Sequence, residues 1–336
     1  MTRRTSSRTA SATRGAPTAG PTVLRIREPG DILGLIPYLL GFHPAESLVA
    51  AFVRQRRVVV TARLDLAAAA DLEALVDQFD VVADQVDTRA MVLIGYSADE
   101  GIRDVMRGLA DVIPFDLVDV LAVSGDRWWS VCCDGDCCPA EGRAYDIEAH
   151  PLAAQAVMAG ISATGTRDDI MSLTAGPPTA ERDRLAAAAE ECAARVDQLS
   201  QRRRKRRIRQ LVSRVLRTDG PTEAEAGEIA VLARDIGVRD EAWAMMSRQD
   251  AEAYVALWRR VVAVSVWPYE AAPLAMLGWA GWLDGNGALL NCCIERLEQV
   301  APDYSLLELC RQISHNAIPP QYLDEIADEL RAVSGW

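Results

Sequence analysis

The feature of this chain that most constrains its fold is a change of hydrophobic period near residue 140. Over residues 22–133, segments typical of strands, which are short and either apolar or alternately apolar and polar, alternate with amphipathic helical segments. That order predicts a mixed sheet covered by helices. From about Ile147 onward the period is helical, and no strand is predicted after residue 140. We therefore expect an α/β N-terminal domain followed by an all-α C-terminal region.

The same change of period, together with composition, divides the chain into four predicted segments. The first has arginines among Ser, Thr and Ala and lacks the apolar core of a secretory signal, which is typical of a disordered basic tail. The second is the α/β domain, the third a set of connecting helices with a basic run, and the fourth an all-helical domain. Their predicted bounds are 1–21, 22–145, 146–220 and 221–336.

Charge, hydropathy and cysteine content limit the partners and the compartment. The net charge of −12 argues against DNA as the main partner. No apolar stretch reaches the ~20 residues that a spanning helix needs, so no membrane span is predicted. Because there are eight cysteines but no secretory signal, we expect reduced thiols and a cytoplasmic location. Nothing in the sequence indicates the oligomeric state.

Cap and turn residues place the elements of the first half. Asp31 is predicted to be the N-cap of a helix that ends at Leu40, where Gly41 suits a C-cap. Ser124-Gly125-Asp126 is predicted to turn a hairpin. The expected strands are Val23–Arg27, Ser47–Val53, Arg57–Leu64, Ala90–Ile94, Asp116–Val123 and Arg127–Cys132, and the expected helices between them are Asp71–Gln78 and Asp99–Val112.

In the second half, the Ala-rich and charged stretch from Thr179 to Leu216 predicts one long helix. Two pairs have the spacing of a capping box, Thr222 with Glu225 and Ser305 with Glu308. Further helices are expected at 151–161, 222–235, 239–246, 251–266, 272–283, 288–300, 306–314 and 320–333.

Part of the helical region has the spacing of a tetratricopeptide repeat, a helix pair of about 34 residues. The matching positions are Leu277, Gly278, Gly285 and Pro302. No second repeat lies in register, and a solenoid needs at least ~3 repeats. We therefore expect helical hairpins that are only partly tetratricopeptide-like. The tryptophans of this region are expected in the core: Trp243, Trp258, Trp267, Trp279 and Trp282.

Several segments together resemble one protein family. They are Pro29-Gly30-Asp31-Ile32-Leu33, Pro37-Tyr38-Leu39-Leu40-Gly41-Phe42-His43-Pro44, Ser47-Leu48-Val49, Thr61-Ala62-Arg63-Leu64-Asp65, Arg127-Trp128-Trp129-Ser130 and Cys137-Cys138-Pro139 before Glu141-Gly142. This set resembles the actinobacterial family called domain of unknown function 4192 over most of residues 22–330. The family usually shows one cysteine, four residues and then Cys-Cys-Pro, whereas here Cys132 and Cys133 both compete for the first position. The resemblance implies this fold and a bacterial cytoplasmic setting, but no activity.

One loop concentrates thiols, and three interpretations of it stay open. Its cysteines are Cys132, Cys133, Cys137 and Cys138. Two vicinal pairs would strain four-fold ligation of one zinc ion, so a remote ligand such as His150 would complete a three-cysteine zinc site. Alternatively, Cys133 and Cys137 form a disulfide across the turn between them, if their Cα atoms lie within ~4.4–6.8 Å. The third interpretation is a set of reduced, packed thiols that close a hairpin end.

A second candidate site groups Tyr38, His43 and Glu46 around the Gly41–Glu46 turn. His43 is one of three histidines, and a loop histidine near a carboxylate can act as a general acid or base. No Gly-x-Ser-x-Gly elbow accompanies it. The alternative is that the turn is structural and that the imidazole bonds to nearby backbone.

A third feature is the basic run from Arg202 to Arg209, with Arg214 and Arg217 beyond it. Such a helix can bind phosphates or an anionic membrane surface. No aromatic residues are interleaved for stacking on single strands. We favour a solvated helix that is partly paired with acidic neighbours.

These features favour a cytoplasmic interaction or regulatory protein without catalysis, with a protein as its partner. Neither a Walker A nor a Gly-x-Gly-x-x-Gly element occurs, so no cofactor is expected. One alternative is an enzyme or small-molecule sensor with its site near the Gly41–Glu46 turn. The other is a thiol or metal sensor that uses the loop from Cys132 to Cys138.

Overall fold

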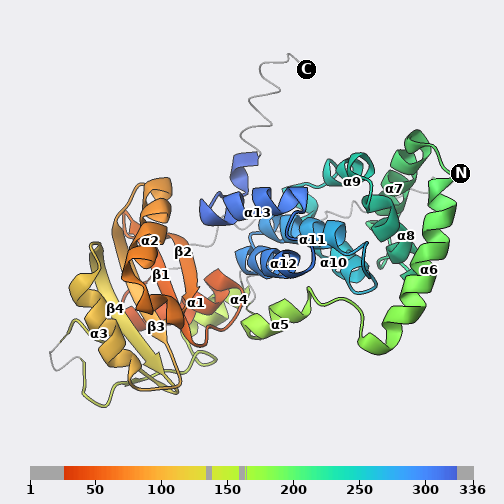
Figure 1. Ribbon diagram of the computed structural model, residues 1–336. Helices are drawn as coiled ribbons and strands as arrows, with labels where there is room; N and C mark the ends of the chain where they lie inside the picture. Colours follow the sequence, from red (N-terminus) through yellow and green to blue (C-terminus); the bar gives the residue numbers. More distant parts are fainter. Residues whose placement is uncertain (1–25, 134–137, 159–162, 164, 324–336) are drawn as a thin grey trace, which may run out of the picture.

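The computed structural model describes residues 26–133, 138–158, 163 and 165–323. A twisted sheet with its helices forms one part of the molecule, and helices alone form the other (Figure 1). The predicted fold class, an α/β half followed by an all-α half, is therefore confirmed. Within the described ranges, every helix is too short or too polar to cross a membrane.

The sheet is mixed, as predicted. Its strands are β1 (Ser47–Arg54), β2 (Arg57–Asp65), β3 (Ala90–Tyr96), β4 (Asp116–Ser124), β5 (Arg127–Ser130) and β6 (Arg143–Ala144). They lie in the order β2-β1-β3-β4-β5-β6, and β3 and β4 form the parallel pair, joined through helix α3 (Ile102–Val112). The prediction of no strand after residue 140 was wrong, because Arg143 and Ala144 pair with Trp128 and Arg127. Two residues are too few to show a strand pattern.

Helices cover both faces of the sheet because successive strand residues point to opposite sides. Helix α1 (Pro29–Leu40) packs Leu33 and Ile36 in one core with Val49 and Ala51 of β1. On the other face, α3 and α2 (Leu72–Val86), which follows the short helix η1 (Leu66–Ala70), share a core with Phe52. That core holds three phenylalanines packed edge to face, with centroids 6.0–6.4 Å apart: Phe52, Phe79 and Phe115.

The first helix begins earlier than the sequence predicted. Its N-cap is Glu28, and Asp31 lies three residues inside as the second half of a capping box. The Asp31 carboxylate accepts hydrogen bonds from the backbone N–H groups of Arg27 and Glu28. Because these groups belong to the cap, Ile26 and Arg27 are not in a strand; the rest of the predicted strand Val23–Arg27 lies outside the described residues. Gly41 ends the helix in the left-handed region (φ 82°), as predicted.

The second half is a helical bundle around one enclosed helix. Helix α4 (Pro151–Met158) precedes the bundle and packs against α1. The elements of the bundle are α5 (Arg167–Ser172), α6 (Thr179–Asp197), α7 (Gln201–Val215), α8 (Glu223–Ala233), α9 (Ile236–Trp243), η2 (Arg248–Asp250), α10 (Ala251–Val262), α11 (Ala271–Leu283), α12 (Gly287–Val300) and α13 (Ser305–His315). Every residue of α11 from Ala272 to Leu283 is buried, so this helix is the centre of the bundle. The predicted helix 320–333 lies mostly outside the described residues. The tetratricopeptide-like spacing stays a prediction.

Two details of the helical half correct the sequence-based expectations. The long helix predicted from Thr179 to Leu216 is in fact two helices, α6 and α7, separated by the non-helical residues 198–200. The capping box of Thr222 and Glu225 is present, but Ser305 is the first residue of α13 and does not cap it. Its hydroxyl accepts a hydrogen bond from buried Arg239 instead.

The tryptophans follow the prediction with one exception. Trp258 is fully buried, and Trp243, Trp279 and Trp282 pack against one another. Trp267, however, is 77% exposed, so its predicted place in the core was wrong. It lies in the loop between α10 and α11.

The two halves share side chains across their junction. Phe42, at the end of α1, is 2% exposed and belongs to the core of the helical half. In the other direction, Ala317 packs against the core that α2 and α3 cover. The sheet edge formed by β2 lies on the side nearer the helical half (Figure 1).

Candidate functional site

The turn from Gly41 to Glu46 lies at this junction. Phe42 points into the helical core, and the backbone N–H of His43 donates to the Gly165 carbonyl, 3.0 Å away. The imidazole of His43 is half-buried and makes no hydrogen bond within the described residues. The turn thus connects the halves through its backbone and through Phe42.

Glu46 has a structural environment of its own. Its backbone is in the left-handed region (φ 42°). Its carboxylate accepts hydrogen bonds from the Ser97 hydroxyl (3.0 and 3.1 Å) and from the Ala98 N–H (2.8 Å). These donors belong to the loop between β3 and α3, where α/β proteins often bind anions. Glu46 therefore links the start of β1 to the β3–α3 loop through its carboxylate.

Tyr38 lies away from both of these residues. It packs on α1 against Leu35 and against Leu152 and Ala156 of α4. The structure therefore places the three predicted residues in three environments: Tyr38 beside α4, His43 beside Gly165, and Glu46 on the β3–α3 loop. A general acid or base needs its partner within about 3 Å, and His43 and Glu46 have other neighbours.

Part of the cysteine loop is described. Cys137 lies outside the described residues, as do Asp134 and Asp136. Cys132 is an exposed free thiol beside Asp119. Partial burial and, next, the negative charge of Asp119 raise the pKa of the Cys132 thiol. This environment favours the protonated thiol, so it lowers the reactivity of Cys132.

Asp119 was not found by sequence reasoning. It accepts hydrogen bonds from the Ser130 hydroxyl (2.6 Å) and the Val120 N–H (2.8 Å), and burial raises the pKa of its carboxyl group. The register of β4 against β3 skips Val118, and this irregularity turns Asp119 toward Ser130. Nothing in the sequence signals a bulge at that position.

His150, the predicted remote zinc ligand, makes contacts away from the cysteine loop. Its Nδ1 accepts from the Leu152 N–H (3.2 Å) at the start of α4, and its Nε2 lies 3.7 Å from the Asp31 carboxylate. Among the described residues, no group of three His, Cys, Asp or Glu side chains converges as metal ligands do. The metal and disulfide interpretations of the cysteine loop therefore stay predictions.

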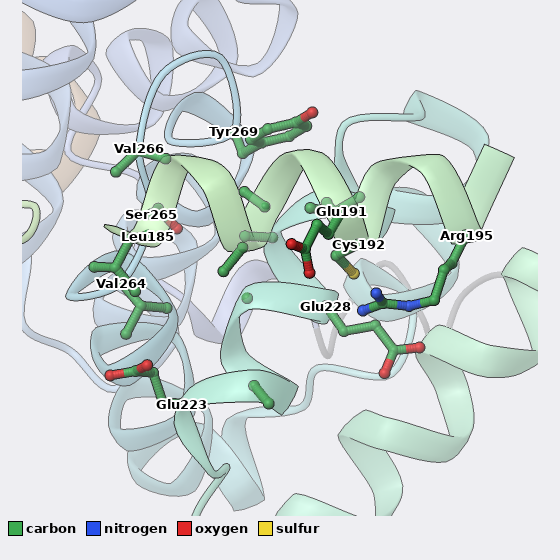
Figure 2. Close-up of a pocket in the computed structure, with 16 residues that line it drawn as sticks. Leu185, Glu191, Cys192, Arg195, Glu223, Glu228, Val264, Ser265, Val266 and Tyr269 are labelled. Atoms are coloured by element: carbon green, nitrogen blue, oxygen red, sulfur yellow. The ribbon is translucent and has the colours of Figure 1, made fainter. Parts of the chain in front are cut away.

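Two adjoining clefts lie in the helical half. The first, of about 180 Å³, lies between α6 and α8 and is closed by the segment from Val264 to Tyr269 (Figure 2). The second, of about 250 Å³, lies beside it between α6 and the same segment. Ser265 and Val266 line both clefts, and exposed Trp267 lines the second.

The first cleft has an apolar floor and a charged rim. Leu185, Ala188 and Val264 are among the residues of the floor, and Glu223 and Glu228 stand on the rim. Glu223 pairs with Arg184 (2.5 Å) and Glu228 with Arg207 (2.6 Å), so these two carboxylates are paired with arginines of α6 and α7. Burial raises the pKa of the Cys192 thiol in this cleft. A cleft of this kind is better suited to binding apolar side chains than to holding a group that reacts.

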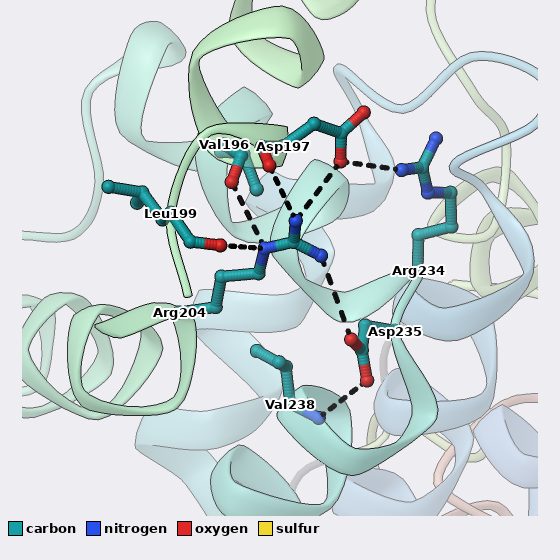
Figure 3. A network of polar contacts seen from close by, with 7 residues as sticks. All are labelled: Val196, Asp197, Leu199, Arg204, Arg234, Asp235 and Val238. Atoms are coloured by element: carbon teal, nitrogen blue, oxygen red, sulfur yellow. Dashed lines mark hydrogen bonds and ion pairs between the residues drawn. The ribbon is translucent and has the colours of Figure 1, made fainter. Parts of the chain in front are cut away.

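Several residues of the basic run form hydrogen bonds or ion pairs with neighbouring helices. Arg204 donates from Nε to the carbonyls of Val196 and Leu199 (3.0 Å each) and from Nη2 to the carbonyl of Asp197 (3.0 Å), which caps the end of α6 (Figure 3). It also approaches the Asp235 carboxylate at 3.8 Å. Further pairs with acidic residues of α8 and α9 are Lys205–Glu241, Arg207–Glu228, Arg209–Glu241 and Arg214–Glu225. These contacts agree with a solvated helix that is partly paired with acidic neighbours.

Comparison with known proteins gives one match. The family model described as "Domain of unknown function (DUF4192)" matches residues 29–321, which include both halves. No curated protein and no solved structure is detectably similar to the chain.

Proposed function

Since the chain belongs to the family described as a domain of unknown function (DUF4192), which supplies no activity to transfer, we propose from its own geometry that it is a cytoplasmic interaction or regulatory protein without catalysis. It binds a protein partner through its helical half. The observation that carries the proposal is Trp267, which is 77% exposed at the second of two adjoining clefts.

An exposed tryptophan at the edge of a cleft has the composition of a binding hot spot. Tryptophan is enriched at the energetic centres of protein interfaces, where partner side chains fill well-packed pockets. Among the described residues, the other tryptophans of the helical half lie in or against its core, so the exposure of Trp267 is not a general property of the bundle.

The size of the clefts favours a protein partner over a small molecule. Small-molecule sites measure about 300–1,000 Å³. The two clefts measure about 180 and 250 Å³, which suits single side chains of a partner. The dispersal of Tyr38, His43 and Glu46 gives less support to an enzyme or small-molecule sensor at the Gly41–Glu46 turn.

Proximity labelling in the source cells followed by binding of purified candidates tests the proposal. We expect Trp267→Ala to weaken binding of a recovered partner at least tenfold in titration calorimetry. Ile236→Ala is the matched control, because Ile236 is 55% exposed on α9 and lines neither cleft. Equal binding by the wild-type chain and both variants would contradict the proposal.

A further inference from the structure

The basic residues of α7 fall into two groups by the direction they face. Arg204, Lys205, Arg207, Arg209 and Arg214 turn toward α6, α8 and α9 and pair with carboxylates there. Arg202, Arg203 and Arg206 are exposed and have no ion-pair or hydrogen-bond partner in the part of the chain that the structure describes. We call these three residues the arginine stripe.

The positive charges of the arginine stripe repel one another. Arg202 and Arg206 are separated by one helical turn, as are Arg203 and Arg206, and like charges at these spacings destabilise a helix. The first turn of α7 contains no acidic residue to offset them. The carboxylates of α8 and α9 nearest to α7, which are Glu225, Glu228 and Glu241, are already paired with the inward group. The fold therefore leaves three guanidinium groups together on one outward face without counter-charge.

The chain itself carries a segment of matching charge. Residues 324–329 read Asp-Glu-Ile-Ala-Asp-Glu, so carboxylates occur at positions i, i+1 and i+4, and also at i+5. The arginines of the stripe occur at i, i+1 and i+4 as well. These acidic residues lie outside the described part of the chain, so the comparison uses their sequence alone. Arginine binds carboxylates by paired hydrogen bonds, which favours this partner over a point anion.

We propose that the arginine stripe of one copy binds residues 324–329 of a second copy. Helix α13 begins beside α9, where Arg239 donates to the Tyr304 hydroxyl (2.9 Å). It then runs toward α2, and Ala317 packs against the core of the sheet half (Figure 1). The chain therefore leaves α13 at the end far from α7, which favours exchange between two copies. Reciprocal exchange closes a two-fold dimer.

Sedimentation velocity of the full chain tests this proposal by charge exchange. One variant reverses the stripe (Arg202→Glu, Arg203→Glu and Arg206→Glu), and the other reverses the acidic segment (Asp324→Arg, Glu325→Arg and Asp328→Arg). We expect the wild-type chain to dimerise at low salt and to dissociate at about 0.5 M salt, where charges are screened beyond ~4 Å. Each variant alone should associate at least tenfold more weakly. An equimolar mixture of the two should form a heterodimer, because each reversed surface then meets its complement.

A control separates the surface from net charge. Arg54→Glu, Arg56→Glu and Arg57→Glu change the charge equally at the exposed β1–β2 turn and should leave dimerisation unchanged. Circular dichroism should show all variants folded, since the substituted stripe residues are exposed. A monomeric wild-type chain at low salt, or a mixture that forms no heterodimer, would overturn the proposal. Equal loss of dimer in the control would also overturn it. The Trp267 clefts play no part in this test.

Discussion

Both carboxylate oxygens of Glu46 lie within 3.1 Å of the Ser97 hydroxyl, and this contact ties the start of β1 to the loop that follows β3. A residue proposed as an acid or base is thereby a link between two strands. Glu46→Ala removes this contact and the bond from the Ala98 N–H. We expect a loss of about 1 kcal/mol in the free energy of unfolding, measured in urea, because hydrogen bonds to an exposed charge are worth little more.

Glu46→Gly gives a control for this prediction. Glycine also removes the carboxylate but suits the left-handed backbone at φ 42°. Glu46→Gly should therefore lower the free energy of unfolding by less than Glu46→Ala does. An alanine variant as stable as the wild-type chain would show that the contact contributes nothing.

Phe42 is expected to contribute more to stability than any other residue of its turn. Phe42→Ala leaves a cavity in the helical core, and such changes cost about 3–5 kcal/mol. Because Phe42 belongs to the other half of the chain, the loss should lower the unfolding midpoints of both halves together. His43→Ala is the control, with an expected change below about 1 kcal/mol. A Phe42→Ala variant in which the sheet half keeps its midpoint would contradict the coupling.

The turn also shows what sequence could and could not predict. Gly41 and Pro44 specify a turn by backbone preference alone, so its place was predicted correctly. That Phe42 enters the core of the other half depends on tertiary packing, which no local pattern encodes. Trp267 shows the reverse case, because its residue type predicts burial and the loop exposes it.

The break between α6 and α7 has a similar origin. No Gly or Pro marks residues 198–200, so periodicity alone continues the helix. The helix ends because Arg204 satisfies the carbonyls of Val196, Asp197 and Leu199. A basic run indicates charge, but it does not reveal which of its members will cap a neighbouring helix.

Arg204→Ala should therefore destabilise the helical half by about 1–3 kcal/mol, since several carbonyls lose a charged donor. Arg203→Ala, one residue away and exposed without a partner among the described residues, should change stability by less than about 0.5 kcal/mol. Guanidinium unfolding followed by circular dichroism measures both. Equal effects of the two substitutions would show that the capping contacts are unimportant.

The thiol of Cys132 should react slowly at neutral pH. Partial burial and the charge of Asp119 raise its pKa, so the thiolate fraction is smaller than that of an ordinary exposed cysteine. Asp119→Asn removes the negative charge and should accelerate alkylation of Cys132 at pH 8. Iodoacetamide labelling with fragment-resolved mass spectrometry distinguishes Cys132 from its neighbours. Fast labelling of the wild-type chain at pH 7 would contradict this prediction and would favour a thiol sensor.

The last prediction concerns acid stability through Glu225. A hydrogen bond from Arg214 and, next, the Thr222 N–H of the capping box lower the pKa of Glu225 to about 2. In the unfolded chain a glutamate titrates near 4.3. The unfolded state therefore binds this proton first, and the stabilisation is complete above about pH 4.5 and is lost as the pH falls toward 2. Glu225→Gln cannot ionise, so its unfolding free energy should vary less between pH 5 and pH 2 than that of the wild-type chain. Urea unfolding across this range measures the difference, and parallel pH profiles would show that the carboxylate of Glu225 does not stabilise the start of α8.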